Sequence, residues 1–238
     1  AVHHLNAAIP RGSLLAVVGP NGGGKSTLLK GMAGLLAPLE GRIDGLAGRR
    51  VAYLPQHAEI DRSFPIRVID LVAMGLWHEI GALGGLSREQ QRRCAAALAA
   101  VGLDGFERRT IDSLSGGQFQ RALFARLSLQ NAEVVLLDEP FAAIDGRTVD
   151  DLMQQLGAWQ RAGTTVVVVL HDLDLVRRHC PQAMWLAREM VAFGPASEVI
   201  DGQHWQRAQP LREAWSPGAR ACERSVPDHP SVQRGELR

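Results

Sequence analysis

The chain has 238 residues, a length that fits one well-cored domain, with or without an inserted subdomain, better than two complete domains. Its 26 Lys and Arg residues nearly balance 25 Asp and Glu residues, so the net charge of +1 predicts no nucleic-acid partner. Three scattered cysteines, Cys94, Cys180 and Cys222, indicate neither a disulfide framework nor a structural zinc site and fit a reducing compartment.

Continuous apolar runs predict buried parallel strands at 14–19, 51–56, 133–138 and 164–171, with the weakest signal at 51–56. Between the last two runs, LMQQLGAWQ has helical periodicity and indicates a βαβ crossover. The longest apolar run, at 166–170, is far shorter than the roughly 20 residues that a membrane span needs. The sequence therefore predicts an α/β core with a mainly parallel sheet.

The segment between Gln56 and Leu114 has a different character, because SREQQRRCAAALAAVGL is strongly helical and no strong strand pattern is present. We therefore expect a core formed by residues 1–56 and 115–200, interrupted by a helical subdomain at 57–114. A short helical pattern follows Gly194. The hydrophobic period is then lost over residues 216–238, and 201–238 are expected to be a partly disordered C-terminal extension.

The stretch GPNGGGKST satisfies the phosphate-binding pattern G-x-x-x-x-G-K-[ST], between an apolar strand and a helical segment. Backbone N–H groups of residues 22–27 are expected to wrap the β-phosphate, with Lys25 neutralising the β- and γ-phosphates. Ser26 would ligate Mg²⁺ and Thr27 would donate near the α-phosphate. The alternative is a glycine-rich turn without a ligand. The candidate nucleotide-binding residues are Gly19, Pro20, Asn21, Gly22, Gly23, Gly24, Lys25, Ser26 and Thr27.

Four polar residues end three of the predicted strands. Asp138 is expected to hold Mg²⁺ through water, and Glu139 to polarise the water that attacks the γ-phosphate. His171 could donate to the γ-phosphate, and Gln56 could contact both Mg²⁺ and that water. Taken singly, these residues could equally be solvated turns, caps or surface residues. Together with Lys25 they would converge on one sheet edge and form a site for ATP and Mg²⁺.

A second glycine-rich stretch, LSGGQ, precedes the helical run QFQRALFARLSL. Ser115 followed by Gln118 fits a capping box, so a helix is expected to begin at this point. The free N–H groups of a helix N-terminus attract anions, and Gly116 and Gly117 would allow close approach. The residues alone leave an ordinary helix cap as the alternative.

Over roughly residues 3–200 the chain resembles the ATP-binding subunit of an ABC transporter. The resemblance identifies GPNGGGKST as the Walker A loop, YLPQ as the Q-loop, LSGGQ as the signature and VVLLDEP as Walker B. It identifies AAID at 142–145 as the D-loop and HD at 171–172 as the switch histidine. It implies a P-loop NTPase fold and ATP hydrolysis, with Glu139, His171 and Gln56 as catalytic residues, ATP and Mg²⁺ as cofactors, and Ser26, Gln56 and Asp138 as magnesium residues.

The resemblance also implies partners. Family subunits pair head to tail, so that the signature of one subunit faces the γ-phosphate held by the other. This adds to the nucleotide site Ser115, Gly116, Gly117, Gln118 and Asp145. Further implied partners are integral membrane permease subunits and, indirectly, an extracytoplasmic substrate-binding protein, which would place the chain peripherally at the cytoplasmic face of the cell membrane. The family's adenine-stacking aromatic residue would precede this sequence, so a missing first strand is expected.

The segment HAEIDRSFPIRVIDLVAMGLW is similar to that of ATPases serving zinc, manganese and related metal importers. It predicts either a docking face for a partner helix or packing within the helical subdomain, with the apolar residues Phe64, Val68, Leu71, Val72 and Trp77. The eight histidines are dispersed, so we expect the choice of transported metal to lie in other subunits. The alternatives are a siderophore, haem or other importer, and a soluble ABC ATPase of DNA repair or translation.

Overall fold

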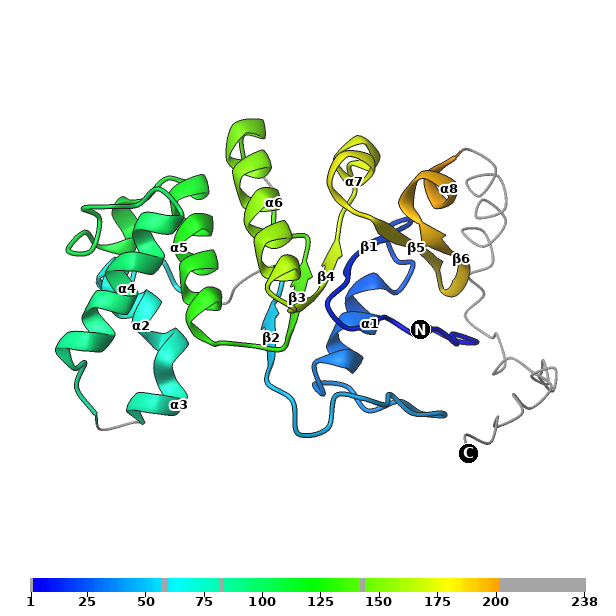
Figure 1. Cartoon of the computed structure of the whole chain (residues 1–238), viewed down its shortest axis with the longest axis horizontal. Helices are drawn as coiled ribbons and strands as arrows, with labels where there is room; N and C mark the ends of the chain where they lie inside the picture. The colour runs from blue at the N-terminus through cyan, green and yellow to red at the C-terminus, as the bar shows by residue number, and fades with distance from the viewer. Residues whose placement is uncertain (1, 57–59, 82–83, 142–143, 202–238) are drawn as a thin grey trace, which may run out of the picture.

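A six-stranded sheet of order β2-β3-β4-β1-β5-β6 lies at the centre of the computed structural model, which describes residues 2–56, 60–81, 84–141 and 144–201 (Figure 1). Its strands are β1 Leu14–Val18, β2 Val51–Leu54, β3 Val134–Asp138, β4 Thr165–Val169, β5 Gln182–Ala187 and β6 Glu189–Pro195. The first five strands are parallel and β6 is antiparallel to β5. The mainly parallel sheet and the four predicted strands are therefore confirmed.

Helices cover both faces of the sheet. Figure 1 shows α1 (Lys25–Met32) on one face, and α6 (Gly146–Arg161), α7 (Leu173–His179) and α8 (Ala196–Ile200) on the other. Alternate residues of β1 enter two separate hydrophobic clusters: Leu15 and Val17 pack with Leu29 of α1, whereas Leu14 and Ala16 face the opposite cluster. Burial on both faces explains why these strands read as continuous apolar runs.

The remaining helices form a group at one end of the molecule (Figure 1). They are α2 Val68–Ala73, η1 Met74–Leu76, α3 Trp77–Ile80, α4 Arg88–Ala100, η2 Ile111–Ser113 and α5 Gly116–Leu129. The helices α2, α4 and α5 pack against one another, and the chain then enters the sheet at β3. This group begins after the end of β2.

Of the two alternatives for the apolar residues of the 64–77 segment, packing within the helical subdomain is confirmed for three. Val68, Leu71 and Val72 are each 0% exposed and pack in the hydrophobic core, so they cannot line a docking face. Phe64 and Trp77, by contrast, are 64% and 59% exposed. The inward residues recur at the helical spacing of α2, and this periodicity explains why they lie on the core side.

No helix within the described ranges is long and apolar enough to cross a bilayer. Several sequence-based expectations fall outside those ranges: the extension beyond Asp201, which includes Cys222, and the first two residues of AAID at 142–143.

Candidate active site

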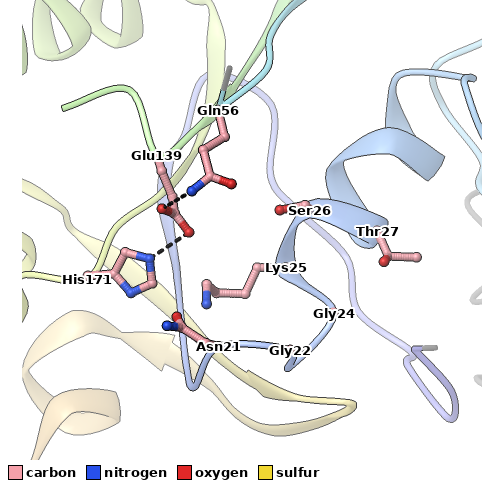
Figure 2. Close-up of a pocket in the computed structure, with 9 residues that line it drawn as sticks. All are labelled: Asn21, Gly22, Gly24, Lys25, Ser26, Thr27, Gln56, Glu139 and His171. Carbon is pink, nitrogen blue, oxygen red and sulfur yellow. Dashed lines mark hydrogen bonds and ion pairs between the residues drawn. The ribbon is translucent and has the colours of Figure 1, made fainter. Parts of the chain in front are cut away.

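The carboxyl ends of β1 to β4 bring the predicted site residues together (Figure 2). They surround a pocket with a volume of about 560 Å³, lined by Asn21, Gly22, Gly24, Lys25, Ser26, Thr27, Gln56, Glu139 and His171. Because parallel strands end at the same sheet edge, residues far apart in the sequence meet here. The expected convergence of Lys25, Gln56, Glu139 and His171 is thus present in the fold.

The loop between β1 and α1 has the shape of an anion cradle. Gly22 and Gly24 have φ angles of 75° and 92°, which side-chain-bearing residues rarely adopt. A Cβ atom on Gly19 would lie 2.0 Å from the carbonyl oxygen of Leu186, so this position also requires glycine. Gly24 caps α1 without a side-chain hydrogen bond, and the N–H groups of the first turn are therefore available to a phosphate.

Lys25 lies buried at the base of this loop, with 5% of its surface exposed. Its Nζ donates to the carbonyl oxygens of Gly19 and Pro20, each at 3.0 Å. Burial lowers the pKa of Lys25, and the nearby carboxylates of Glu139 and Asp138 oppose that shift. Two neutral carbonyl groups thus hold the ammonium group of a residue that lines the pocket.

Asp138, the last residue of β3, has 2% of its surface exposed and is not among the residues that line the pocket. Its two carboxylate oxygens accept hydrogen bonds from Ser26 Oγ at 3.1 Å and from Tyr53 Oη at 3.4 Å. The pKa of Tyr53 is raised to about 12, mainly by burial and further by the charge of Asp138 and this hydrogen bond. Tyr53 therefore remains a neutral donor that orients the carboxylate toward Ser26. Sequence reasoning missed this residue, since nothing in the pattern of β2 points to Asp138.

Glu139 follows β3 with a φ angle of 48°, an unusual conformation for a residue with a side chain. Its two carboxylate oxygens lie 2.7 Å from Gln56 Nε2 and 2.6 Å from His171 Nε2 (Figure 2). The side chain of Glu139 is 18% exposed and that of His171 is 45% exposed. The carboxylate is thus anchored from two further strand ends while it borders the pocket.

The signature residues form a different local structure. Ser115 Oγ accepts from the N–H of Gln118 at 3.2 Å, and Gln118 Oε1 accepts from the N–H of Ser115 at 3.0 Å. The predicted capping box at the start of α5 is therefore confirmed. The residues that line the pocket do not include Ser115, Gly116, Gly117 or Gln118.

Asp145 also lies apart from the pocket, at the N-terminus of α6. Its carboxylate accepts hydrogen bonds from the N–H of Thr148 at 3.0 Å and from Thr148 Oγ1 at 2.8 Å. The backbone and side-chain hydrogen bonds of Thr148 lower the pKa of Asp145. Gly117 lies beside this carboxylate, since a Cβ atom there would be 3.6 Å from Asp145 Oδ2. The signature and Asp145 thus form a second cluster within the chain.

Comparison with known proteins agrees with this geometry. The family described as ABC transporter matches residues 2–142. This chain belongs to the ABC transporter family. As a member, it is an ATP-binding subunit that hydrolyses ATP, and the expected fold class, an α/β P-loop NTPase core of the ABC ATPase type, is confirmed.

Relatives and solved structures are consistent with this assignment. The manganese transport system ATP-binding protein MntB of Listeria monocytogenes is 38% identical, over 87% of this chain and 89% of that protein. The zinc transport system ATP-binding protein TroB of Treponema pallidum is 35% identical, over 86% and 79%.

An inward-facing metal-chelate type ABC transporter has a TM-score of 0.78 at 28% identity, covering 87% of this chain and 81% of its own. A dimeric bacterial ABC transporter cassette has a TM-score of 0.71 at 27% identity, covering 82% and 90%.

Proposed function

We propose that this ABC ATPase powers the import of a divalent metal ion, manganese or zinc. The observation that carries the proposal is the identity of 35–38% with ATP-binding proteins named for manganese and zinc transport. The matched region spans most of this chain and most of each relative, so the similarity extends beyond the nucleotide-binding motifs.

ATP would bind with its phosphates on the Walker A loop. The positive φ angles of Gly22 and Gly24 and the start of α1 without a side-chain cap support phosphate binding by backbone N–H groups. Lys25 would exchange its carbonyl partners for phosphate oxygens. This exchange is favourable because a charge-assisted bond to an anion is stronger than a bond to a neutral carbonyl group.

The magnesium ion that accompanies ATP would be held by Ser26, Asp138 and Gln56. These side chains offer hydroxyl, carboxylate and carboxamide oxygens, the ligands that suit Mg²⁺, and Ser26 Oγ already lies 3.1 Å from Asp138 Oδ1. The ion would supply charge neutralisation on the phosphates. Glu139 would then accept a proton from the attacking water, oriented by Gln56 and His171.

The complete site would need a second copy of the chain. Within one chain, Ser115 to Gln118 lie outside the pocket that contains Lys25 and Glu139, and this separation supports a homodimer in which each signature faces the partner's Walker A loop. The dimeric cassette among the similar structures agrees with such an arrangement. Asp145, beside Gly117, would lie at the same interface.

The domain organisation and location follow from the same proposal. Residues 1–56 and 115–200 would form one discontinuous ABC domain, with 57–114 as the helical subdomain that contacts integral membrane permease subunits. The exposure of Phe64 and Trp77 supports a contact there. The ATPase would lie peripherally at the cytoplasmic face of the cell membrane and act indirectly with an extracytoplasmic substrate-binding protein.

Metal accumulation in a strain that lacks this chain tests the proposed cargo. Cells complemented with the wild type should regain high-affinity uptake of manganese or zinc, whereas cells complemented with Glu139→Gln should not. Uptake of a siderophore complex or haem is measured in parallel. Restoration of chelate uptake alone, with manganese and zinc uptake unchanged, would contradict the proposal.

A further inference from the structure

Two histidines at the start of the described chain lie beside the first residue of β6. The Nδ1 atoms of His3 and His4 are 3.0 Å apart, and they lie 3.1 Å and 3.7 Å from Glu189 Oε1. Among the described residues, these three side chains form a group whose potential metal-ligand atoms all lie within 4.8 Å of one another. The sequence alone does not reveal this group, because Glu189 is remote from the histidine pair.

The backbone explains how neighbouring side chains reach the same point. In an extended strand, consecutive side chains point to opposite faces. His4 instead has a φ angle of 50°, which turns the chain and lets both imidazoles approach Glu189. The N–H of His3 also donates to the carbonyl oxygen of Arg188 at 2.9 Å, so the histidine pair is fixed to the β5–β6 turn.

The geometry points to a binding site for a divalent transition metal ion of the zinc type, formed by His3, His4 and Glu189. Tetrahedral Zn²⁺ with ligands at about 2.0–2.1 Å requires ligand atoms about 3.3 Å apart. The three observed separations of 3.0, 3.1 and 3.7 Å bracket that value. An ion could therefore bind with small side-chain adjustments.

The donor set also determines which ions fit. Two imidazole nitrogens and one carboxylate oxygen suit Zn²⁺ and its transition-metal neighbours, whereas Mg²⁺ prefers oxygen ligands alone. The side chains of His3, His4 and Glu189 are 39%, 27% and 29% exposed, so solvent reaches the group. A site with three protein ligands and a fourth position open to solvent is typical of a metal ion that exchanges, whereas closed structural sites have four protein ligands.

Backbone contacts connect the histidine group to the Walker A loop. Arg188, whose carbonyl oxygen binds His3, donates its own N–H to the carbonyl oxygen of Gly23 at 2.8 Å. Val2 contacts the loop as well, because a Cβ atom on Gly24 would lie 2.4 Å from Val2 Cγ2. An ion that joins the histidine pair to Glu189 would fix both supports of the phosphate-binding loop. Metal occupancy and nucleotide affinity are therefore coupled, in the direction of tighter nucleotide binding.

The site is tested with Zn²⁺ alone on the full chain, purified without a histidine tag and titrated against a chromophoric chelator. We expect one Zn²⁺ equivalent that His3→Ala and Glu189→Gln each weaken by about tenfold or more. His78→Ala is the matched control, since His78 is also exposed and lies 3.9 Å from a carboxylate, that of Glu79. Circular dichroism and thermal melting check that each variant folds. Wild-type zinc affinity and stoichiometry in both site variants would overturn the assignment, as would an equal loss in His78→Ala.

The coupling is measured as the affinity for ADP with and without one equivalent of Zn²⁺, in the presence of excess Mg²⁺. Zn²⁺ should tighten ADP binding about fivefold or more in the wild type and leave it unchanged in His3→Ala. An equal effect in both proteins, or no effect in the wild type, would overturn the coupling. Neither measurement depends on which substrate is transported, so failure here leaves the proposed function standing.

Discussion

His171 Nε2 lies 2.6 Å from Glu139 Oε1, while Gln56 Nε2 lies 2.7 Å from the other oxygen of the same carboxylate. A carboxylate only accepts hydrogen bonds, so both neighbours act as donors and His171 presents its Nε2–H to Glu139. Each carboxylate oxygen has a second lone pair free for a water molecule. The arrangement fixes the orientation of the proposed base before nucleotide binds, which is the form of preorganisation that favours proton transfer.

Replacement of Glu139 by Gln removes the proposed base but keeps a side chain of nearly the same size and shape. We expect ATP to bind with near-wild-type affinity and hydrolysis to slow about 10²-fold or more, the scale of a positioned general base. Phosphate release and nucleotide binding are measured on the same purified protein. Glu40→Gln, at an exposed glutamate that does not line the pocket, serves as the control and should be unaffected. A turnover rate of Glu139→Gln close to that of wild type would exclude the proposed role.

Two glycines of the Walker A loop differ in why a side chain is disfavoured: Gly22 has only an unusual φ angle, whereas Gly19 also lacks space for a Cβ atom. Gly19→Ala places a Cβ atom 2.0 Å from the carbonyl oxygen of Leu186, whereas Gly22→Ala meets no atom within 4 Å. Both residues have positive φ angles, 143° and 75°. We expect Gly22→Ala to lower the free energy of unfolding by about 1 kcal/mol, and Gly19→Ala to lower it by about 1–3 kcal/mol more. Urea denaturation without nucleotide measures both. Equal losses would mean that the contact with Leu186 relaxes without cost.

Tyr53 is the single tyrosine of the chain, so its ionisation can be followed by tyrosinate absorbance. The raised pKa, about 12 against a usual 10.0, means that the fold favours the neutral form. The contribution of neutral Tyr53 to the free energy of unfolding is complete below pH 10 and is lost as the pH rises toward 12. A rapid pH jump, read before unfolding, should give a midpoint near 12, and Asp138→Asn should lower it. A wild-type midpoint near 10 in the folded protein would contradict the burial of Tyr53 against Asp138.

Substitutions of an exposed and of a buried residue in the 64–77 segment are expected to have opposite effects on stability and uptake. Phe64→Ala alters an exposed side chain, so folding and basal ATPase activity should be retained while metal uptake in complemented cells falls. Leu71→Ala, at a residue with 0% exposure, should instead lower the free energy of unfolding by about 2–5 kcal/mol. Thermal melting, ATPase assays and uptake distinguish the two variants. Normal uptake with Phe64→Ala would contradict a role for this residue in docking.

Much of the fold could be predicted from the sequence because local signals were strong. The strands β1, β3 and β4 are buried on both faces and read as unbroken apolar runs, and the capping box at Ser115 specifies its own hydrogen bonds. The strands β5 and β6 were not predicted; β6 is antiparallel to β5, half-exposed and at the sheet edge.

The unpredicted parts of the site depend on tertiary contacts. Tyr53 reaches Asp138 across 85 positions of sequence, and Arg188 supports Gly23 through backbone atoms that no side-chain pattern encodes. The sequence left both docking and core packing open for Leu71, because an amphipathic stripe does not say whether its apolar side faces the core or a partner. Residues that follow strand ends, such as Glu139 and His171, were predictable because sheet topology brings those ends together.

The central claim is that ATP is hydrolysed at a site completed by the signature of a second copy, and disulfide cross-linking tests it directly. Cysteines replace Ser115 and Asn21 in a variant without the three native cysteines, and Glu139→Gln is added to retain ATP. A disulfide requires Cα atoms within about 7 Å, so cross-linking reports direct apposition of the two residues. We predict a covalent dimer on a non-reducing gel that is abundant with ATP and Mg²⁺ and scarce with ADP. A disulfide within single chains, or equal cross-linking without nucleotide, would contradict the shared site and leave Ser115 as a helix cap.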